Sequence, residues 1–144
     1  AMGDAGLERV KYIGYWNSNN EGYVGRDIVE QFKKKYNDDY YAMTTYTILS
    51  MLGTALKQTN SSDPVSVAYA LEGMKTQSLN GEVAMRTSDH QLQQPLYIAT
   101  FARKNDRDVR FDSENTGFGW RTERKIDAYV AAQPTSCQMT RPSR

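Results

Sequence analysis

The residue types that most often do chemistry are few and scattered in this chain. His90 is the single histidine among the 144 residues and stands between Asp89 and Gln91. A Ser-His-Asp relay would also need a serine held on a sharp strand-to-helix turn, and the sequence contains no G-x-S-x-G motif. A zinc site needs more His or Cys ligands than this sequence has. We therefore interpret His90 as a turn residue.

The remaining reactive residues also lack suitable partners. Cys137 is the only cysteine, so it cannot form a disulfide within the chain; we interpret it as a structural thiol or as one that pairs with another chain. The acids at 38–39 and 106–108 lack the ligand spacing of a calcium-binding loop. The glycines at 117–119 lack the third glycine and the preceding strand of a dinucleotide loop. The sequence predicts no enzyme, no metal site and no cofactor.

Aromatic and polar residues gather between positions 12 and 23, where a short strand is expected to end. Open α/β sheets bind ligands beyond the carboxyl ends of their strands. Small-molecule clefts are walled by aromatic side chains with a few polar groups. We therefore predict a ligand-binding site at Tyr15, Trp16, Asn17 and Glu21, with Trp16 as the best candidate for a wall. The alternative is that the aromatic residues pack in a core or a hinge.

Charge argues against a nucleic-acid partner. Lys and Arg total 18 against 17 Asp and Glu, which gives a net charge of +1. Such a balance provides no field that would gather nucleic acid or an anionic membrane. The one basic run, at 33–35, closes a helical pattern, where cations complement the helix dipole, so we interpret it as a solvated helix end. Residues 1–4 do not resemble the start of a signal peptide.

The elements that would position the site alternate between strands and helices. A strand is predicted at 10–16, an amphipathic helix at 24–36 and a second helix at 41–57. The second helix is apolar on most sides, with one stripe formed by Tyr46, Leu49, Leu52 and Leu56, so it should lie between layers. Asp63 and Pro64 signal the start of a third helix.

The C-terminal half begins with two predicted strands, at 79–86 and 95–101, joined by the polar loop 87–94. These two strands are expected to border one sheet. A charged turn at 104–108, a loop at 114–120, a helix at 122–132 and a tail follow. Length and pattern together indicate one α/β unit.

Four segments resemble the C-terminal part of the periplasmic solute-binding proteins of branched-chain amino-acid ABC transporters, the leucine/isoleucine/valine-binding type. The run 5–12 is similar to the approach to the last strand of the second lobe, and 24–36 is similar to a helix ending in F-x-x-x-Y. The helix at 41–56 carries the Thr-Thr-Tyr start, although Thr47 stands where many members have Asp. The segment 63–98, with DP, ALEG, GEVAMRTSDHQL and PLYI in order, is the most specific.

The resemblance implies an α/β fold that is part of a type I periplasmic-binding-protein architecture, with two Rossmann-like lobes. It assigns residues 1–16 to the end of the second lobe, 17–23 to an inter-lobe crossover, 24–102 to the first lobe, and 103–144 to a crossover and a tail on the second lobe. The family's mature chain is more than twice this long. This piece would therefore supply one rim of the cleft, and its open strand edges and apolar helix should favour self-association.

The function implied by the resemblance is capture and delivery without bond making. Such a protein closes its hinge around an amino acid or a related small carboxylate or amide in the periplasm and presents it to the membrane permease of an ABC transporter. The alternative function is that of a free-standing small-molecule sensor or interaction module of the same architecture. Neither alternative requires a cofactor or nucleic acid.

Overall fold

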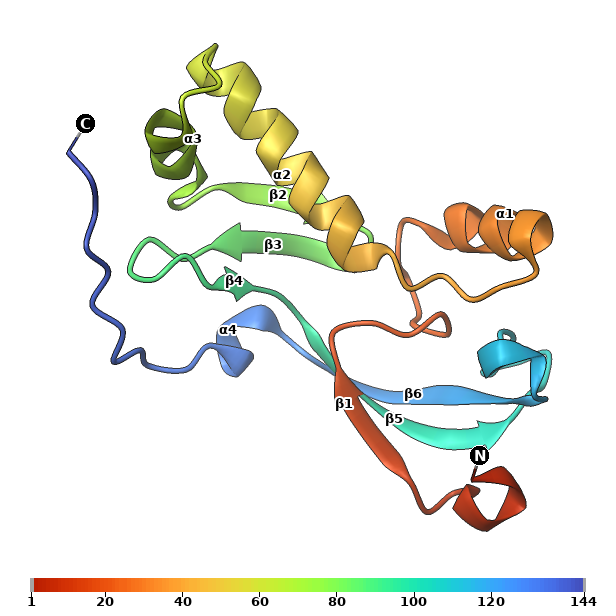
Figure 1. Ribbon diagram of the computed structural model, residues 1–144. Coiled ribbons are helices and arrows are strands. Elements are labelled where there is room, and N and C mark those ends of the chain that lie inside the picture. The colour runs from red at the N-terminus through yellow and green to blue at the C-terminus, as the bar shows by residue number, and fades with distance from the viewer. Residues whose placement is uncertain (1, 144) are drawn as a thin grey trace.

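Two antiparallel sheets and a set of helices make up this computed structural model, which describes residues 2–143 (Figure 1). Along the chain the elements are η1 (Gly3–Gly6), β1 (Lys11–Gly14), α1 (Arg26–Tyr36), α2 (Met43–Thr59), α3 (Pro64–Leu71), β2 (Lys75–Ser78), β3 (Gly81–Met85), β4 (Leu92–Gln93), β5 (Leu96–Arg103), η2 (Ser113–Asn115), β6 (Phe118–Ile126) and α4 (Ala128–Ala131).

The first sheet has the order β1-β5-β6 and draws its strands from both ends and the middle of the chain. Lys11 pairs with Thr100 and Leu96 with Ile126, and a bulge at Ile98–Ala99 shifts the second register. The central strand β5 is the most apolar of the three, and it is buried from Ala99 to Ala102. This sheet carries the end of β1, where the ligand-binding site was predicted.

The second sheet, in the order β2-β3-β4, packs against α2 and α3. Its core contains Met51 and Ala55 from α2, Val67 from α3, and Met74 and Val83 from the hairpin. The buried hydroxyls of Thr47 and Ser78 lie 2.6 Å apart and join α2 to β2 by a hydrogen bond. Thr47, which departs from the family's aspartate, therefore has a structural partner in this sheet.

The three helices predicted before residue 75 are confirmed, with small shifts at their ends. Helix α1 ends at Tyr36 and is capped by Asn37, which has a left-handed backbone (φ 50°) and donates its N–H to the carbonyl of Lys33. Helix α3 begins at Pro64, and the Asp63 side chain accepts a hydrogen bond of 2.8 Å from the backbone N–H of Ser66. Asp63 is thus the N-cap that the sequence predicted.

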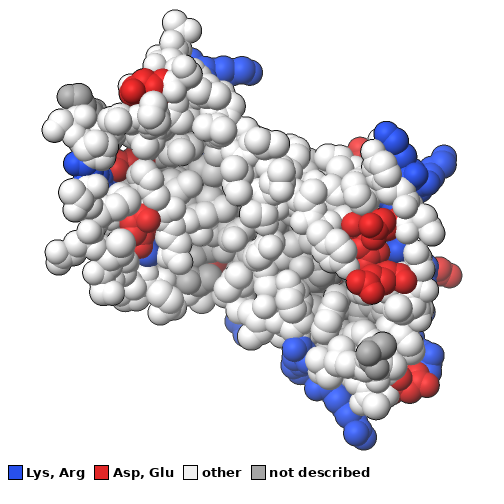
Figure 2. All heavy atoms as spheres, viewed as in Figure 1, with Lys and Arg blue, Asp and Glu red and all other residues white. Residues whose placement is uncertain are grey.

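Helix α2 is buried on one face only. Met43, Thr47, Met51 and Ala55 form the buried face. The opposite face exposes Ile48 and Leu49, which are 55% and 61% accessible, together with the half-exposed Leu52 and Leu56. Figure 2 shows an uncharged surface along this helix. The predicted apolar stripe that contains Leu49, Leu52 and Leu56 therefore points away from the second sheet.

The prediction for the C-terminal region was wrong. The nine-residue strand β6 takes up the end of the expected loop at 114–120 and most of the expected helix at 122–132, and only Ala128–Ala131 is helical. The reason is the long antiparallel ladder that β6 forms with β5. Glu123 of β6 also reaches across the central strand to Lys11 of β1, with the charged atoms 2.6 Å apart. Gly119 fits because an added Cβ would lie 2.6 Å from the carbonyl oxygen of Phe111.

The pairing of the middle strands also differs from the prediction. The expected strand at 79–86 begins only at Gly81, because Leu79 and Asn80 form the turn that follows the unpredicted strand β2. The strand expected at 95–101 does not border β3; as β5 it pairs with β1 and β6. Within residues 2–143, no helix combines the length and apolar character needed to cross a membrane.

Candidate functional site

A cavity of about 290 Å³ opens beside the segment that follows β1. Four stretches of chain surround it: β1 with the loop that follows it, the linker between α1 and α2, the segment around the start of η2, and β6 through Trp120. More than half of its lining residues are aromatic. The lining residues are Tyr12, Tyr15, Trp16, Asn17, Ser18, Asn19, Asp39, Tyr40, Tyr41, Phe111, Asp112, Ser113 and Trp120.

The structure brings together three of the four residues predicted for the site. Tyr15, Trp16 and Asn17 all line the cavity. Glu21 does not; it is exposed and borders a separate hollow of about 320 Å³ together with Arg26. The predicted set is therefore split between two surface depressions.

Trp16 lies between the cavity and the protein core. It is 7% exposed, and its indole N–H donates a hydrogen bond of 3.2 Å to the carbonyl of Tyr40. Its ring meets Tyr23 edge to face, with centroids 5.0 Å apart. Burial raises the pKa of the Tyr23 hydroxyl to about 12. Both predicted roles, core packing and cavity wall, are thus compatible with the position of Trp16.

Asparagine side chains fix the loop after β1. Asn17 Nδ2 donates to Asn20 Oδ1 over 2.7 Å, and Thr122 of β6 donates to the same oxygen over 3.0 Å. Asn19 exchanges two hydrogen bonds with the backbone of Phe111 (2.8 and 2.9 Å) and donates one to the carbonyl of Trp120. Hydrogen bonds from the turn-forming residues 17–20 therefore hold the loop, β6 and Phe111 together around one cavity.

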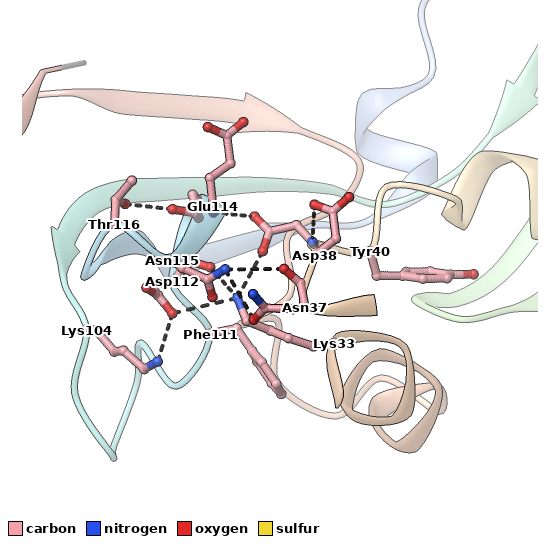
Figure 3. A network of polar contacts seen from close by, with 12 residues as sticks. Lys33, Asn37, Asp38, Tyr40, Lys104, Phe111, Asp112, Glu114, Asn115 and Thr116 are labelled. Atoms are coloured by element: carbon pink, nitrogen blue, oxygen red, sulfur yellow. Dashed lines mark hydrogen bonds and ion pairs between the residues drawn. The ribbon is translucent and has the colours of Figure 1, made fainter. Parts of the chain in front are cut away.

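A charged network joins two rims of the cavity, the linker before α2 and the run into η2 (Figure 3). Lys33 Nζ lies 3.0 Å from Asp39 Oδ1 and 3.7 Å from Asp112 Oδ1, and Lys104 Nζ lies 2.8 Å from Asp112 Oδ1. Burial by itself would raise the pKa of Asp112, but hydrogen bonds from Lys104 and the backbone N–H of Gly117 outweigh it and lower that pKa to about 2. Asp112 is therefore a carboxylate at neutral pH.

The second carboxylate of this network, that of Asp39, also accepts hydrogen bonds from neighbouring groups. Its Oδ2 accepts hydrogen bonds from the backbone N–H of Glu114 (2.9 Å) and from the Tyr41 hydroxyl (3.1 Å). Burial and the negative charge of Asp39 together raise the pKa of Tyr41 to about 12. The only charged residues of the lining are these two aspartates, while the lysines that balance them lie outside it.

Neutral hydroxyls remain available in the cavity. Within residues 2–143, no hydrogen bond joins the side-chain oxygens of Tyr15, Ser18 or Ser113 to another group. Aromatic faces with free hydroxyls can hold a small molecule by stacking and hydrogen bonding. This arrangement is suited to binding.

The other reactive residues lie elsewhere. His90 Nε2 is 3.2 Å from Glu72 Oε1, and Arg141 Nε is 2.6 Å from the same oxygen. The pKa of Glu72 is lowered, chiefly by the hydrogen bond from Arg141. Cys137 is exposed in the C-terminal tail. In the described part of the chain, no three His, Cys, Asp or Glu residues are grouped so that they could hold a metal ion.

Sequence comparison finds a matching family. A family described as "Periplasmic binding protein" matches residues 1–107, which is most of the chain. No curated protein sequence matches.

Solved structures share the fold at low sequence identity. The leucine-, isoleucine-, valine-, threonine- and alanine-binding protein of Brucella ovis, in its closed conformation, has a TM-score of 0.81 at 21% identity over 98% of this chain and 37% of its own. A solute-binding protein of an ABC transporter from Rhodopseudomonas palustris BisB5, in complex with 3,4-dihydroxybenzoic acid, has a TM-score of 0.71 at 23% identity, over 89% of this chain and 33% of its own.

A third structure extends the same likeness. The solute-binding protein from Rhodopseudomonas palustris HaA2, in complex with p-hydroxybenzoic acid, has a TM-score of 0.68 at 16% identity, over 88% of this chain and 33% of its own. The likenesses confirm the predicted α/β fold as part of a periplasmic-binding-protein architecture. This chain spans about a third of the length of these similar structures.

Proposed function

Because this chain belongs to the periplasmic binding protein family, we propose that it forms part of the substrate-binding component of an ABC transporter. That component captures a small molecule in the periplasm and delivers it to a membrane permease. The observation that carries the proposal is the aromatic cavity at the end of β1, where Tyr15, Trp16 and Asn17 meet. The family and the similar structures are binding proteins, in line with capture rather than conversion of the ligand.

The ligand we propose is an amino acid or a related small carboxylate or amide. By its name, the first similar structure binds leucine, isoleucine, valine, threonine and alanine, and the other two are complexes with hydroxybenzoic acids. The lining of the cavity includes Asp39 and Asp112 but neither Lys nor Arg. A carboxylate group would be poorly placed against this wall because like charges repel. We therefore orient the ammonium or apolar end of the ligand toward this chain, with any carboxylate held by the rest of the protein.

The two sheets suggest how the chain divides between the two lobes. We assign the sheet β1-β5-β6 and the tail to the second lobe, and the segment that begins at residue 24 to the first, with 17–23 as the crossover. Since β5 pairs with β1 and β6, we place the return to the second lobe at 94–95 instead of residue 102. The cavity then lies where the two lobes meet, and closure of the hinge would enclose the ligand.

The experiment uses the full-length protein that contains this chain. Isothermal titration calorimetry with L-leucine, the other amino acids and hydroxybenzoic acids identifies the ligand. Tryptophan fluorescence then tests the wall, after Trp120 has been replaced by Phe so that Trp16 is the only tryptophan in this part of the protein. An unchanged Trp16 signal on addition of a ligand that calorimetry detects would remove Trp16 from the site.

The alternative, a free-standing sensor or interaction module, makes a different prediction. A module of that kind would bind its ligand with the 144 residues alone and would melt cooperatively as a monomer. The transporter component instead requires a reading frame that continues upstream into the first lobe. Absence of binding for every compound tested with the full-length protein would count against the proposed function.

A further inference from the structure

We propose that Lys33 is a positioning residue for this ligand site: its ammonium holds two rims of the cavity together without lining the cavity itself. The inference rests on the proposed function, because it concerns the affinity of that site. The group that carries it is the charged network in Figure 3.

The two rims come from distant parts of the chain. Asp39 belongs to the linker between α1 and α2, and Asp112 and Ser113 lead into η2. All three line the cavity. Lys33, in the last turn of α1, does not line it. Its side chain is 18% exposed, against 10% for Asp39 and 4% for Asp112, so the three charged groups meet in a poorly solvated place.

One ammonium serves both carboxylates. Lys33 Nζ lies 3.0 Å from Asp39 Oδ1 and 3.7 Å from Asp112 Oδ1, and it also donates a hydrogen bond of 3.0 Å to the carbonyl of Asp112. The other nearby cation, Lys104, pairs only with Asp112 and is half-exposed. Without Lys33, Asp39 would keep only its neutral donors and would face Asp112 across the rim.

Removal of Lys33 therefore abolishes the attraction between the two rims, and it leaves Asp39 without a cation beside Asp112, which keeps Lys104. Breaking a buried pair by deleting one partner is costly because the remaining charge stays poorly solvated. The exposed acids Asp38 and Glu114 lie on the same two segments and add to the negative charge. In a protein without Lys33, we expect the two segments to move apart and admit water, so that the cavity becomes wider.

The neighbouring lysines provide a natural contrast. Lys34 and Lys35 are exposed, and among residues 2–143 neither has an ion pair. The interpretation of the basic run as a solvated helix end therefore fits Lys34 and Lys35 but is wrong for Lys33. This contrast makes Lys34→Met a matched control, with the same residue type, the same substitution and an adjacent position.

The first test measures the rims without any ligand. Nitroxide labels are placed on Ala42→Cys and Glu114→Cys in the Cys137→Ser full-length protein, with any cysteine outside this chain also replaced, and their separation is measured by pulsed electron resonance. We expect Lys33→Met to lengthen and broaden the distance distribution, Lys34→Met to leave it unchanged, and Lys33→Arg to restore it. An unchanged distribution in a folded Lys33→Met protein overturns the proposal.

The second test measures affinity by calorimetry, with L-leucine or p-hydroxybenzoic acid, whichever the wild-type protein binds. We expect Lys33→Met to weaken binding by about tenfold. Adding Asp39→Asn should recover part of that loss, because it removes one of the repelling charges. A purely structural role predicts the reverse, a further loss in the double variant, and that result would reject the proposal.

Two provisions keep the outcomes distinct. If Lys33→Met fails to fold, Lys33→Gln keeps a donor but removes the charge, and the same distance and affinity predictions apply to it. If the wild-type protein binds neither compound nor any other candidate, the proposed function fails, while the label distances still decide whether Lys33 holds the rims together.

Discussion

The indole N–H of Trp16 donates a hydrogen bond to the backbone carbonyl of Tyr40, 3.2 Å away, and the two rings meet edge to face with centroids 6.1 Å apart. This contact fastens the loop after β1 to the linker that precedes α2. It also places the tryptophan in the same core cluster as Val29 and Met43. Trp16 therefore both lines the cavity and belongs to the hydrophobic core that supports the cavity.

Replacing Trp16 with Ala should lower the free energy of unfolding by about 3 to 5 kcal/mol, since both packing and the hydrogen bond are lost. Trp16→Phe should lower the free energy of unfolding by a smaller amount, because most of the ring contacts remain. Tyr129→Ala, at a side chain that is 80% exposed, is the control and should have little effect. Urea denaturation of the full-length protein measures all three. Equal midpoints for Trp16→Ala and the control would show that Trp16 is not a core residue.

Acid should weaken the rim through Asp112. The ordinary pKa of 3.8 is lowered to about 2 in the folded protein, chiefly by the hydrogen bond from Lys104, against the opposing effect of burial. A lowered pKa means that the stabilisation is complete above about pH 4 and is lost as the pH falls toward 2. We expect a loss of about 2 kcal/mol from this group over that interval.

The measurement is the unfolding free energy as a function of pH for the wild type and for Asp112→Asn. The variant should be less stable near neutral pH and should show a shallower decline below pH 4. Asp106→Asn, in the exposed turn after β5, is the control. Parallel curves for the wild type and Asp112→Asn would refute the assignment.

Two glycines should respond to alanine in opposite directions. Gly53, in the interior of α2, has no atom within 4 Å of an added Cβ, so Gly53→Ala should raise the unfolding free energy by about 0.5 to 1 kcal/mol through helix propensity. At Gly119, the Cβ would lie 2.6 Å from Phe111 O and 2.9 Å from Val109 Cγ1. Gly119→Ala should therefore lower the unfolding free energy by about 1 to 3 kcal/mol. Thermal melts of the two variants provide the comparison, and a shift of the same sign in both would be contrary to this reading.

The exposed face of α2 should drive self-association of the 144-residue chain. Ile48 and Leu49 on this face have no cover among the described residues. Leu49→Glu should shift the weight-average mass toward that of a monomer in sedimentation equilibrium over a concentration series. The control Gln58→Glu introduces the same charge at another exposed position of α2 and should leave the weight-average mass unchanged. Association that persists unchanged in Leu49→Glu would mean that another surface mediates it.

Local signals predicted the helices well. The apolar spacing of α1 and the Asp63-Pro64 start of α3 depend on neighbouring residues, so they can be read from sequence alone. Strand β6 could not be, because its charged residues and two nearby glycines are typical of a loop or a helix until β5 is present as a partner. The apolar character of α2 did not by itself reveal which of its faces packs on the second sheet.

The site was predicted in part. Tyr15, Trp16 and Asn17 of the cavity lining were predicted because they follow a strand, whereas Asp39 was interpreted only as a loop acid. Phe111 and Asp112 were missed because only the hydrogen bonds of Asn19 and the pairing of β6 bring them to this cavity. Contacts between distant segments are set by the complete fold.

The interleaved order of the first sheet has a consequence for how the protein folds. The second sheet and its helices come from one continuous run, 43–93, and can form from local contacts. Strand β1 must find β5 across that whole run, and such long-range pairing is slow because the intervening chain has to be closed into a loop. We therefore expect the strand that leads into Trp16 to dock late in folding, and we expect a ligand held by its loop to slow the detachment of this strand during unfolding.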